Sequence, residues 1–324
     1  MGLASARKHF GEAHPTVARS SSNLALVYKA LGRYEAAAAL LESALASDRK
    51  HFGEAHPTVA RRSSNLALVY KALGRYEAAA ALLESALASA RKHFGEAHPN
   101  VAISSSNLAL VYQALGRYEA AAALLESALA SDRKHFGEAH PNVAISSSNL
   151  AVVYQDLGRY EAAAALLEAA LASDRKHFGE AHPTVAIRSS NLALVYQDLG
   201  RYEAAAALLE AALASDRKHF GEEHPTVAIR SSNLATVYQD LGRYEAAAAL
   251  LESALASDRK HFGEAHPNVA RSSSNLATVY LDLGRIEEAR QLFSSAYIVF
   301  LNVLGVGHPN TVTVKKWLDR ISDS

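Results

Sequence analysis

Apolar and small side chains recur along the chain at helical spacing, in pairs of neighbouring segments. The first segment of a pair runs from Pro15 to Gly32, with apolar positions at Val17, Leu24, Ala25, Tyr28 and Leu31. The second runs from Tyr34 to Gly53, with apolar or small positions at Ala37, Ala38, Leu41, Ala44, Leu45 and Phe52. Proline suits a first helical turn, and glycine the residue after a last one. The pattern predicts pairs of helices whose narrow apolar faces are buried by stacking.

The helix pair repeats with a fixed period of 42 residues. The motif Asn-Leu-Ala returns with its asparagine at Asn23, Asn65, Asn107, Asn149, Asn191, Asn233 and Asn275. A period of this size is typical of a stacked array in which each unit contacts mainly its neighbours. We therefore expect a single all-α repeat domain over residues 1–324. Its seven units are expected to start at Pro15, Pro57, Pro99, Pro141, Pro183, Pro225 and Pro267.

The two ends of the chain differ from the units between them. Leu3–Phe10 matches Leu45–Phe52, so we expect a partial second helix over 3–13, with no dedicated N-terminal cap. The helix Ile286–Leu304 is apolar around more of its circumference than its counterparts. We expect it to contact a C-terminal capping helix at 309–322, a second copy or a further domain. The contacts are predicted for Val299, Phe300 or Leu301, and the capping helix has its apolar face at Val314, Trp317, Leu318 and Ile321.

The unit resembles the tetratricopeptide repeat, through residues Leu24, Ala25, Tyr28, Gly32, Tyr34, Ala37, Leu41 and Ala44. The 42-residue length and the starts His-Pro-x-Val-Ala and Asn-Leu-Ala-x-x-Tyr resemble the kinesin light chain subclass. The resemblance implies a right-handed superhelical α-solenoid of antiparallel helix pairs that acts as a scaffold for protein–protein interaction. The near identity of the units indicates recent duplication or a consensus-type engineered array.

Composition excludes several other classes. The chain has 33 basic and 33 acidic side chains, so it lacks the excess positive charge of a general nucleic-acid binder. It has no cysteine and no apolar run long enough to cross a membrane, and we expect a cytoplasmic protein. We predict no metal site, because the repeated histidines of His-Phe-Gly-Glu-x-His-Pro flank helix ends without forming a closed ligand set. No nucleophile or cofactor loop is present, so we expect neither an enzyme nor a cofactor.

Positions that differ between the units predict the binding surface. They cluster at the places of residues 19, 20, 26, 29 and 30. Residues 19, 22, 26, 29, 30 and 33 are expected to share one stripe of the first helix, which in the resembled family lines a groove for extended peptides. The asparagines match family residues that can hold a peptide backbone, although they could instead tie neighbouring helices together. The predicted groove residues comprise Arg19, Asn23, Lys29, Arg61, Asn65, Lys71, Asn107, Gln113, Asn149, Gln155, Asp156, Asn191, Gln197, Asp198, Asn233, Gln239, Asp240, Asn275 and Asp282.

Charge along this stripe is uneven. Lys29 and Lys71 occur in the first two units, where Arg62 also lies beside the stripe, and aspartates occupy the rim from Asp156 onward. Arg188, Arg230 and Arg271 are expected to offset those aspartates in part. We expect an acidic segment to prefer the N-terminal half and a basic segment the aspartate rim. Asp48 and its neighbours Arg49 and Lys50 are interpreted as a solvated helix face, and the tyrosines as packing residues.

A second function remains open at this point. The chain could be a structural or engineered array with no natural ligand, associating with itself through its terminal repeats. A peptide ligand, with no membrane and no nucleic acid, is the partner that the sequence favours.

Overall fold

The computed structural model describes residues 3–11, 14–96 and 98–322. These residues form 16 α-helices and no strand, which confirms the all-α helix-pair solenoid. The chain divides into two compact units, 1–166 and 167–324. Unit 1 contains α1 Leu3–Phe10, α2 Pro15–Ala30, α3 Tyr34–Phe52, α4 Pro57–Ala72, α5 Tyr76–Phe94, α6 Pro99–Ala114, α7 Tyr118–Phe136 and α8 Pro141–Asp156. Helix α9, Tyr160–Phe178, contains the boundary. Unit 2 contains α10 Pro183–Asp198, α11 Tyr202–Phe220, α12 Pro225–Asp240, α13 Tyr244–Phe262, α14 Pro267–Asp282, α15 Ile286–Leu304 and α16 Pro309–Ser322.

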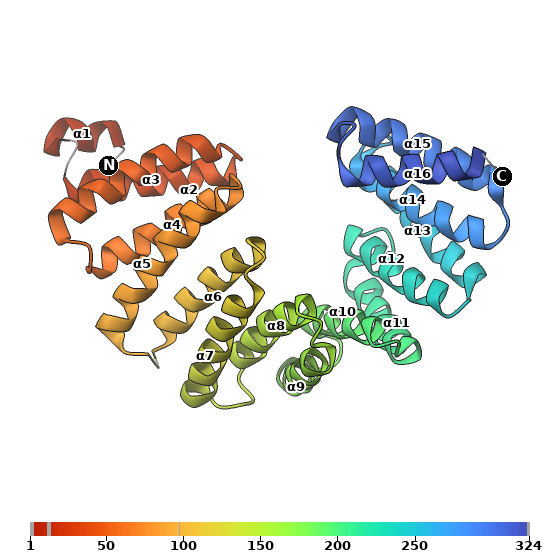
Figure 1. Ribbon diagram of the computed structural model, residues 1–324, viewed down its shortest axis with the longest axis horizontal. Coiled ribbons are helices and arrows are strands. Elements are labelled where there is room, and N and C mark those ends of the chain that lie inside the picture. Colours follow the sequence, from red (N-terminus) through yellow and green to blue (C-terminus); the bar gives the residue numbers. More distant parts are fainter. Residues whose placement is uncertain (1–2, 12–13, 97, 323–324) are drawn as a thin grey trace. The chain divides into compact units, whose positions relative to one another are not determined.

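Within each unit, every helix packs on the helix before it and the helix after it (Figure 1). We call the helices that begin at a His-Pro dipeptide A helices, and the intervening ones B helices. In unit 1 the A helices are α2, α4, α6 and α8. An A helix and the B helix that follows it form an antiparallel pair. The B helix also packs on the A helix of the next pair, as α3 packs on both α2 and α4.

Each A helix from α2 to α14 is capped at its start by a histidine side chain and at its end by backbone hydrogen bonds. Nδ1 of His98 accepts a hydrogen bond from the amide of Asn100 at 3.1 Å, and Pro99 occupies the first turn. The His98 ring stacks on Phe94 at 4.6 Å between centroids. At the other end Gly116 has φ of 71°, and the amide of Arg117 bonds to the carbonyl of Tyr112 at 2.8 Å. This six-residue bond closes a Schellman motif, so the glycine is required by its left-handed conformation.

The core lies between each B helix and its two flanking A helices. Ala37, Ala38, Leu41, Ala44 and Leu45 of α3 are all buried, as the sequence pattern predicts. They pack with Val59, Leu66 and Val69 of α4 and Ala25 of α2.

Three features of the predicted core are wrong or incomplete. Phe52 is 40% exposed, because it stacks on His56 at the helix end instead of entering the core. Leu31 is 64% exposed, and Leu73 at the equivalent place is only partly buried. The position of Val69, which is 1% exposed, was not recognised as a core position.

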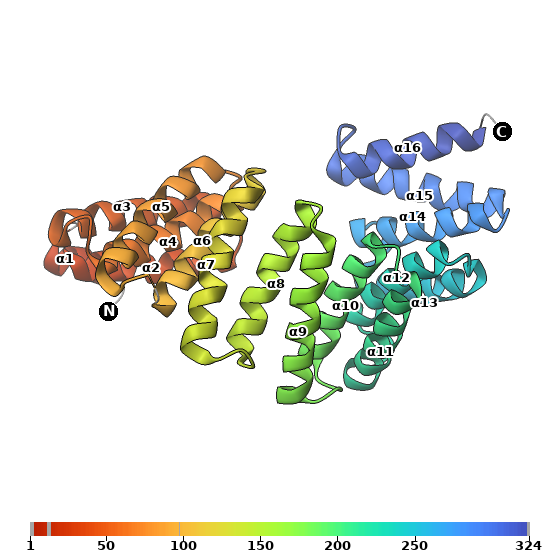
Figure 2. The ribbon, with the colours of Figure 1, turned by 60° about the horizontal axis from the view of Figure 1, so that its bottom comes forward.

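The last B helix is covered by α16, which packs along it (Figure 2). Phe300 is 2% exposed and lies in one buried cluster with Val314 and Ile321 of α16, in agreement with the contact predicted for Phe300. The Trp317 ring stacks on Phe293 with 6.0 Å between centroids. Burial under the final helix thus explains Phe293 and Phe300, whereas Ile298, Leu301 and Val303 of α15 remain exposed.

Candidate binding surface on the A helices

Buried ion pairs join successive repeats, and they correct the predicted charge distribution. Nε of Arg62 donates to Oδ2 of Asp48 at 2.7 Å, and the arginine also donates to the carbonyl of Ala18 at 3.1 Å. Asp48 is therefore buried, and its interpretation as part of a solvated face is wrong. Arg188 pairs with Asp174 and Arg230 with Asp216 in the same way, so these arginines do not offset the aspartate rim.

Up to α14, the same junction takes three forms. Beyond the Asp–Arg form, Asp132 accepts a hydrogen bond from the Ser146 hydroxyl at 2.5 Å, and Asp258 accepts one from Ser272 at 2.5 Å. The third form has Ala90 facing the place of Ser104, whose hydroxyl bonds to its own helix at Asn100. An arginine occurs at this position only where the preceding B helix supplies an aspartate. This matching avoids an uncompensated buried charge.

A second junction lies at the exposed edge of each repeat. The hydroxyl of Tyr112 donates to Glu84 at 2.8 Å, and Arg117 contacts both carboxylate oxygens of Glu77 at 3.1 Å while its guanidinium lies 5.6 Å from the Tyr112 ring centroid. Desolvation, and next the bond to Glu84, raise the pKa of Tyr112 above its ordinary value. The pKa values of Tyr70, Tyr154, Tyr196, Tyr238 and Tyr280 are raised for the same reasons. These tyrosines therefore join neighbouring repeats through hydrogen bonds as well as through packing.

The asparagines of the predicted groove lie at the surface of the A helices. Asn23 is exposed and the other six are half-buried. Their side chains make no hydrogen bond to the described part of the chain. The alternative that they tie neighbouring helices together therefore has no hydrogen bond to support it. Their amides are available to a ligand, since an amide both donates and accepts.

Apolar side chains flank these asparagines, and the prediction omitted them. Ile103 is 60% exposed and Leu110 38% exposed, one helical turn on either side of Asn107. Ile145 and Val152 occupy the same places on α8, and Ile187 and Leu194 on α10. The sequence contained a sign of them, because each is an apolar residue on the otherwise polar stripe, at a position that differs between repeats. We call the exposed surface at the places of residues 19, 23 and 26 the A face.

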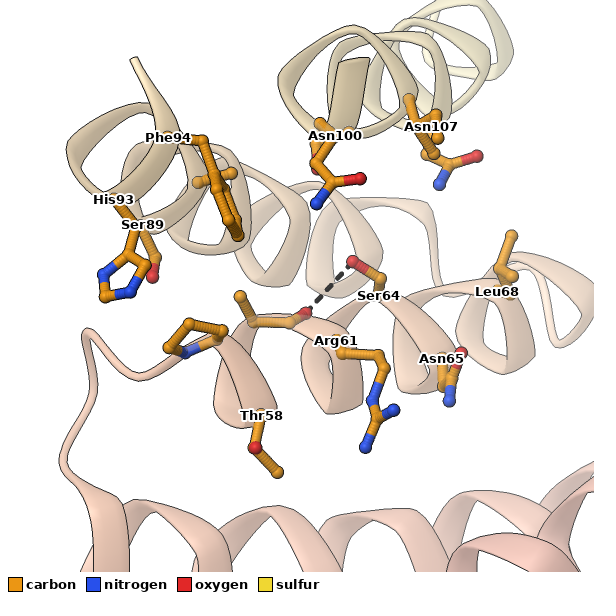
Figure 3. A pocket seen from close by; sticks show the side chains of 15 residues that line it. Thr58, Arg61, Ser64, Asn65, Leu68, Ser89, His93, Phe94, Asn100 and Asn107 are labelled. Atoms are coloured by element: carbon orange, nitrogen blue, oxygen red, sulfur yellow. Dashed lines mark hydrogen bonds between the residues drawn. The ribbon is translucent and has the colours of Figure 1, made fainter. Parts of the chain in front are cut away.

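The A face of unit 1 is hollowed between successive A helices. A cavity of about 470 Å³ is lined by Arg19, Asn23, Arg61 and Asn65, with the Asp48–Arg62 pair in its wall. The next, of about 500 Å³, lies between α4 and α6, and a third of about 280 Å³ lies between α6 and α8. Figure 3 shows the second cavity, with Arg61 and Asn65 on α4 and Asn100 and Asn107 on the facing helix. Each cavity is thus edged by asparagines of two consecutive units.

At the C-terminal ends of the A helices, the predicted glutamine and aspartate residues contact one another. Nε2 of Gln113 donates to Oδ2 of Asp156 at 2.5 Å, and Gln197 pairs with Asp240 and Gln239 with Asp282 in the same manner. The remaining predicted glutamine and aspartate, Gln155 and Asp198, lie in different units. Gln155 is half-buried and Asp198 is exposed. We call the glutamine and aspartate side chains at the places of residues 29 and 30 the rail. They lie beside the A face and line none of the three cavities.

The rail is absent from the first repeats. Lys29 and Lys71 stand where later units have glutamine, and the places that would hold their aspartates are Ala72 and Ala114. Neither lysine, nor Arg19 or Arg61, forms an ion pair with the described residues. Ser22, predicted to lie on the same stripe, is buried instead. The first two repeats consequently carry four positive charges without an acidic partner: Arg19 and Arg61 on the A face, and Lys29 and Lys71 at the places of the rail glutamines.

Unit 2 carries equivalent residues on its own A helices. Asn191, Asn233 and Asn275 are half-buried on α10, α12 and α14, and Arg271 is exposed near the start of α14. Exposed Ile229 lies on α12, where Thr236 replaces the apolar residue one turn after the asparagine.

The described residues contain no group of three or more histidine, aspartate or glutamate side chains that could hold a metal ion. In the same ranges, no helix combines the length and the apolar character that crossing a membrane requires. The imidazoles at the helix starts serve as caps, as shown for His98.

Comparison with known proteins identifies the family. The tetratricopeptide repeat profile matches residues 3–50, 16–92, 58–134, 100–176, 183–260 and 225–302. The chain belongs to the tetratricopeptide repeat family. Members of this family generally mediate protein–protein interactions. No curated protein matches the chain.

Solved structures support the same family and the kinesin light chain-like subclass. The nearly identical TPR-like repeats of a kinesin light chain from Podosopora anserina share 32% identity, with a TM-score of 0.58, over 63% of this chain and 97% of that one. BtubC (BKLC) from P. vanneervenii shares 26% identity, with a TM-score of 0.60, over 73% of this chain and 94% of that one. The apo form of RapI, at 14% identity and a TM-score of 0.65, resembles it in fold alone.

Proposed function

We propose that this tetratricopeptide repeat protein is a non-enzymatic scaffold that binds an extended segment of a partner protein along its A face. The observation that carries the proposal is the row of asparagines with unused hydrogen-bonding groups, flanked by exposed isoleucine and leucine side chains. Such amides can pair with the donor and acceptor of a peptide backbone. The apolar flanks and the cavities would take side chains of the same segment.

Charged side chains of the A helices favour particular residues in the bound segment. Arg19, Lys29, Arg61 and Lys71 carry no acidic partner at the start of the A face. An acidic segment would be drawn to this region, because unpaired positive charges attract and orient it. On the rail, Asp240 and Asp282 bond to neutral glutamines and not to cations, so a basic segment would be favoured beside them.

The test is a titration of the full chain with two labelled peptides, one rich in aspartate and glycine and one rich in lysine and glycine. The variant Lys29→Glu, Lys71→Glu should weaken binding of the acidic peptide about tenfold and should not weaken binding of the basic one, because the new carboxylates attract positive charge. A matched control is Lys134→Glu, because Lys134 is exposed at the end of a B helix, away from the A face.

Salt gives a second readout in the same titration. Binding of the acidic peptide should weaken from low to physiological ionic strength, because exposed charges are screened. Failure of both peptides to bind would favour an array without a ligand, and equal binding of the acidic peptide to wild type and double variant would remove the charge assignment.

A further inference from the structure

We infer that the histidines at the starts of the A helices, α16 included, form an acid-sensitive switch that holds these helix starts closed while the imidazoles are neutral and releases them on protonation. The eight cap histidines are His14, His56, His98, His140, His182, His224, His266 and His308. The inference concerns the stability of the array and does not depend on the binding of a partner segment.

The cap has the same geometry in every copy. Nδ1 of the histidine accepts a hydrogen bond from the amide two residues later, at 3.1 or 3.2 Å in all eight cases. An imidazole nitrogen accepts only while it is unprotonated, because both nitrogens of the imidazolium are donors. Protonation therefore leaves a first-turn amide without its acceptor. It also places a positive charge at the positive end of the helix dipole.

Among the described residues of the loops, no carboxylate is free to receive that charge. In the loop before α6, Glu96 is the only acidic residue, and it pairs with Arg91 at 3.0 Å. The loop before α12 has a second glutamate, Glu223, which pairs with Lys260. The loops between 53 and 266 carry the pairs Arg49–Glu54, Arg91–Glu96, Arg133–Glu138, Arg175–Glu180, Arg217–Glu222 and Arg259–Glu264. A protonated cap would have to compete with an existing cation for each carboxylate.

The other groups around a cap are neutral or cationic. His98 stacks on Phe94 of α5, and His93 meets the edge of the same ring with 5.4 Å between centroids. Lys92 is exposed in the same last turn of α5. From α7, Lys134 stands at the place of the lysine that reaches the loop before α12. A proton on His98 would therefore add to a local charge that is already positive.

The remaining seven of the 15 histidines lie at the opposite kind of helix end. They are exposed in the last turns of the B helices, at His9, His51, His93, His135, His177, His219 and His261. A positive charge at that end is favoured by the helix dipole, and protonation there leaves every cap intact. The two sets can therefore be separated by substitution.

The direction of the effect follows from the caps. Histidine takes up its proton between about pH 8 and pH 5. All caps are formed above this range, and they are lost as the pH falls through it, so the free energy of unfolding should fall with them. Thr58, in the first turn of α4, lines two cavities of the A face. Release of such turns would loosen the rim of that surface.

The experiment measures the denaturant midpoint of the full chain at pH 7.5, 6.5 and 5.5, above the ordinary titration of carboxyl groups. The midpoint of wild type should fall across this range. Replacing all eight cap histidines by asparagine, a preferred N-cap residue that does not titrate, should leave the midpoint nearly constant. Replacing the seven B-helix histidines by asparagine is the matched control and should keep the fall of wild type.

A smaller pair of variants gives the same test with little risk to folding. His98→Asn, His140→Asn removes two of the eight caps and should recover about a quarter of the midpoint lost by wild type, if the caps contribute equally. The control His93→Asn, His135→Asn changes two histidines of the same loops and should recover none of it. A wild-type midpoint that stays constant from pH 7.5 to 5.5, or a control that recovers as much as the cap variant, would overturn the inference.

Discussion

Arg62 and Asp48 form an ion pair that is buried from solvent, with side-chain exposures of 7% and 1%. The two residues belong to successive repeats, so the pair fixes how α4 sits on α3. Elsewhere in the chain the same position holds Asp132 with Ser146 or Ala90 with Ser104. Up to α14, the chain thus contains three natural forms of one junction, and they can be exchanged experimentally.

The first prediction concerns the order of stability among exchanged junctions. Asp48→Ala leaves Arg62 buried without its carboxylate and should destabilise the protein by about 3–5 kcal/mol. Arg62→Ser recreates the Asp–Ser junction and should be milder. The double variant recreates the Ala–Ser junction and should lie within about 1 kcal/mol of wild type. Denaturant midpoints measure the order, and a double variant as unstable as Asp48→Ala would contradict it.

The second prediction distinguishes two kinds of glycine. Gly116→Ala should lower stability by about 1 kcal/mol, because alanine tolerates the left-handed conformation poorly. Gly137 has φ of 83° and ψ of 154°, a region essentially restricted to glycine, so Gly137→Ala should cost about 1–3 kcal/mol. Neither added methyl group would meet an atom within 4 Å, which isolates the backbone effect. Equal melting temperatures for Gly137→Ala and wild type would remove the strain argument.

The third prediction uses two copies of one valine. Val111 is 1% exposed beneath the preceding B helix, whereas Val27 is 53% exposed, because α1 covers less of α2 than α5 covers of α6. Val111→Ala should cost about 2 kcal/mol from lost burial and the cavity left behind. Val27→Ala, the matched control, should change stability by less than about 0.5 kcal/mol. Similar losses in thermal melting would show that Val27 is covered in solution.

The fourth prediction follows from the raised pKa of Tyr112 and its five counterparts. A group whose pKa is higher in the folded than in the unfolded chain contributes stability that is complete below the unfolded value, about 10 for tyrosine. That stability is lost as pH rises through the folded value. The free energy of unfolding should therefore fall above about pH 10, and less steeply in Tyr112→Phe. Ultraviolet titration of phenolate formation measures the tyrosine pKa values directly, and midpoints at the ordinary value would contradict the prediction.

The sequence predicted the fold well because its determinants are local and repeated. Proline marks a helix start, glycine marks a helix end, and the pattern from Ala37 to Leu45 marks the buried face. Each can be recognised without knowing which helices pack nearby. Contacts between repeats were harder to infer. Asp48 and Arg62 are charged and flanked by polar residues, so each reads as exposed until the packing of α3 on α4 brings them together.

The candidate surface was predicted only in part, because some of its residues are fixed by contacts between repeats. The asparagines were found from their period, and their exposure places them on the A face. Gln113 and Asp156 vary together because they bond each other, so variation between repeats reported a structural pair as well as a surface. Ile103 was missed because only polar and charged residues of the predicted stripe were selected, although its place on that stripe was recognised.

The central claim is that the asparagines hold the main chain of a bound segment, and the double variant Asn65→Ala, Asn107→Ala tests it most directly. Binding of acidic, basic and phenylalanine-containing peptides should be measured for this variant and for wild type, with thermal melting as the folding control. If the amides bind the backbone, affinity should fall by a similar factor, about tenfold, for every peptide that contacts them, while the melting temperature stays unchanged. Unchanged affinity for every peptide in a folded variant would contradict the account.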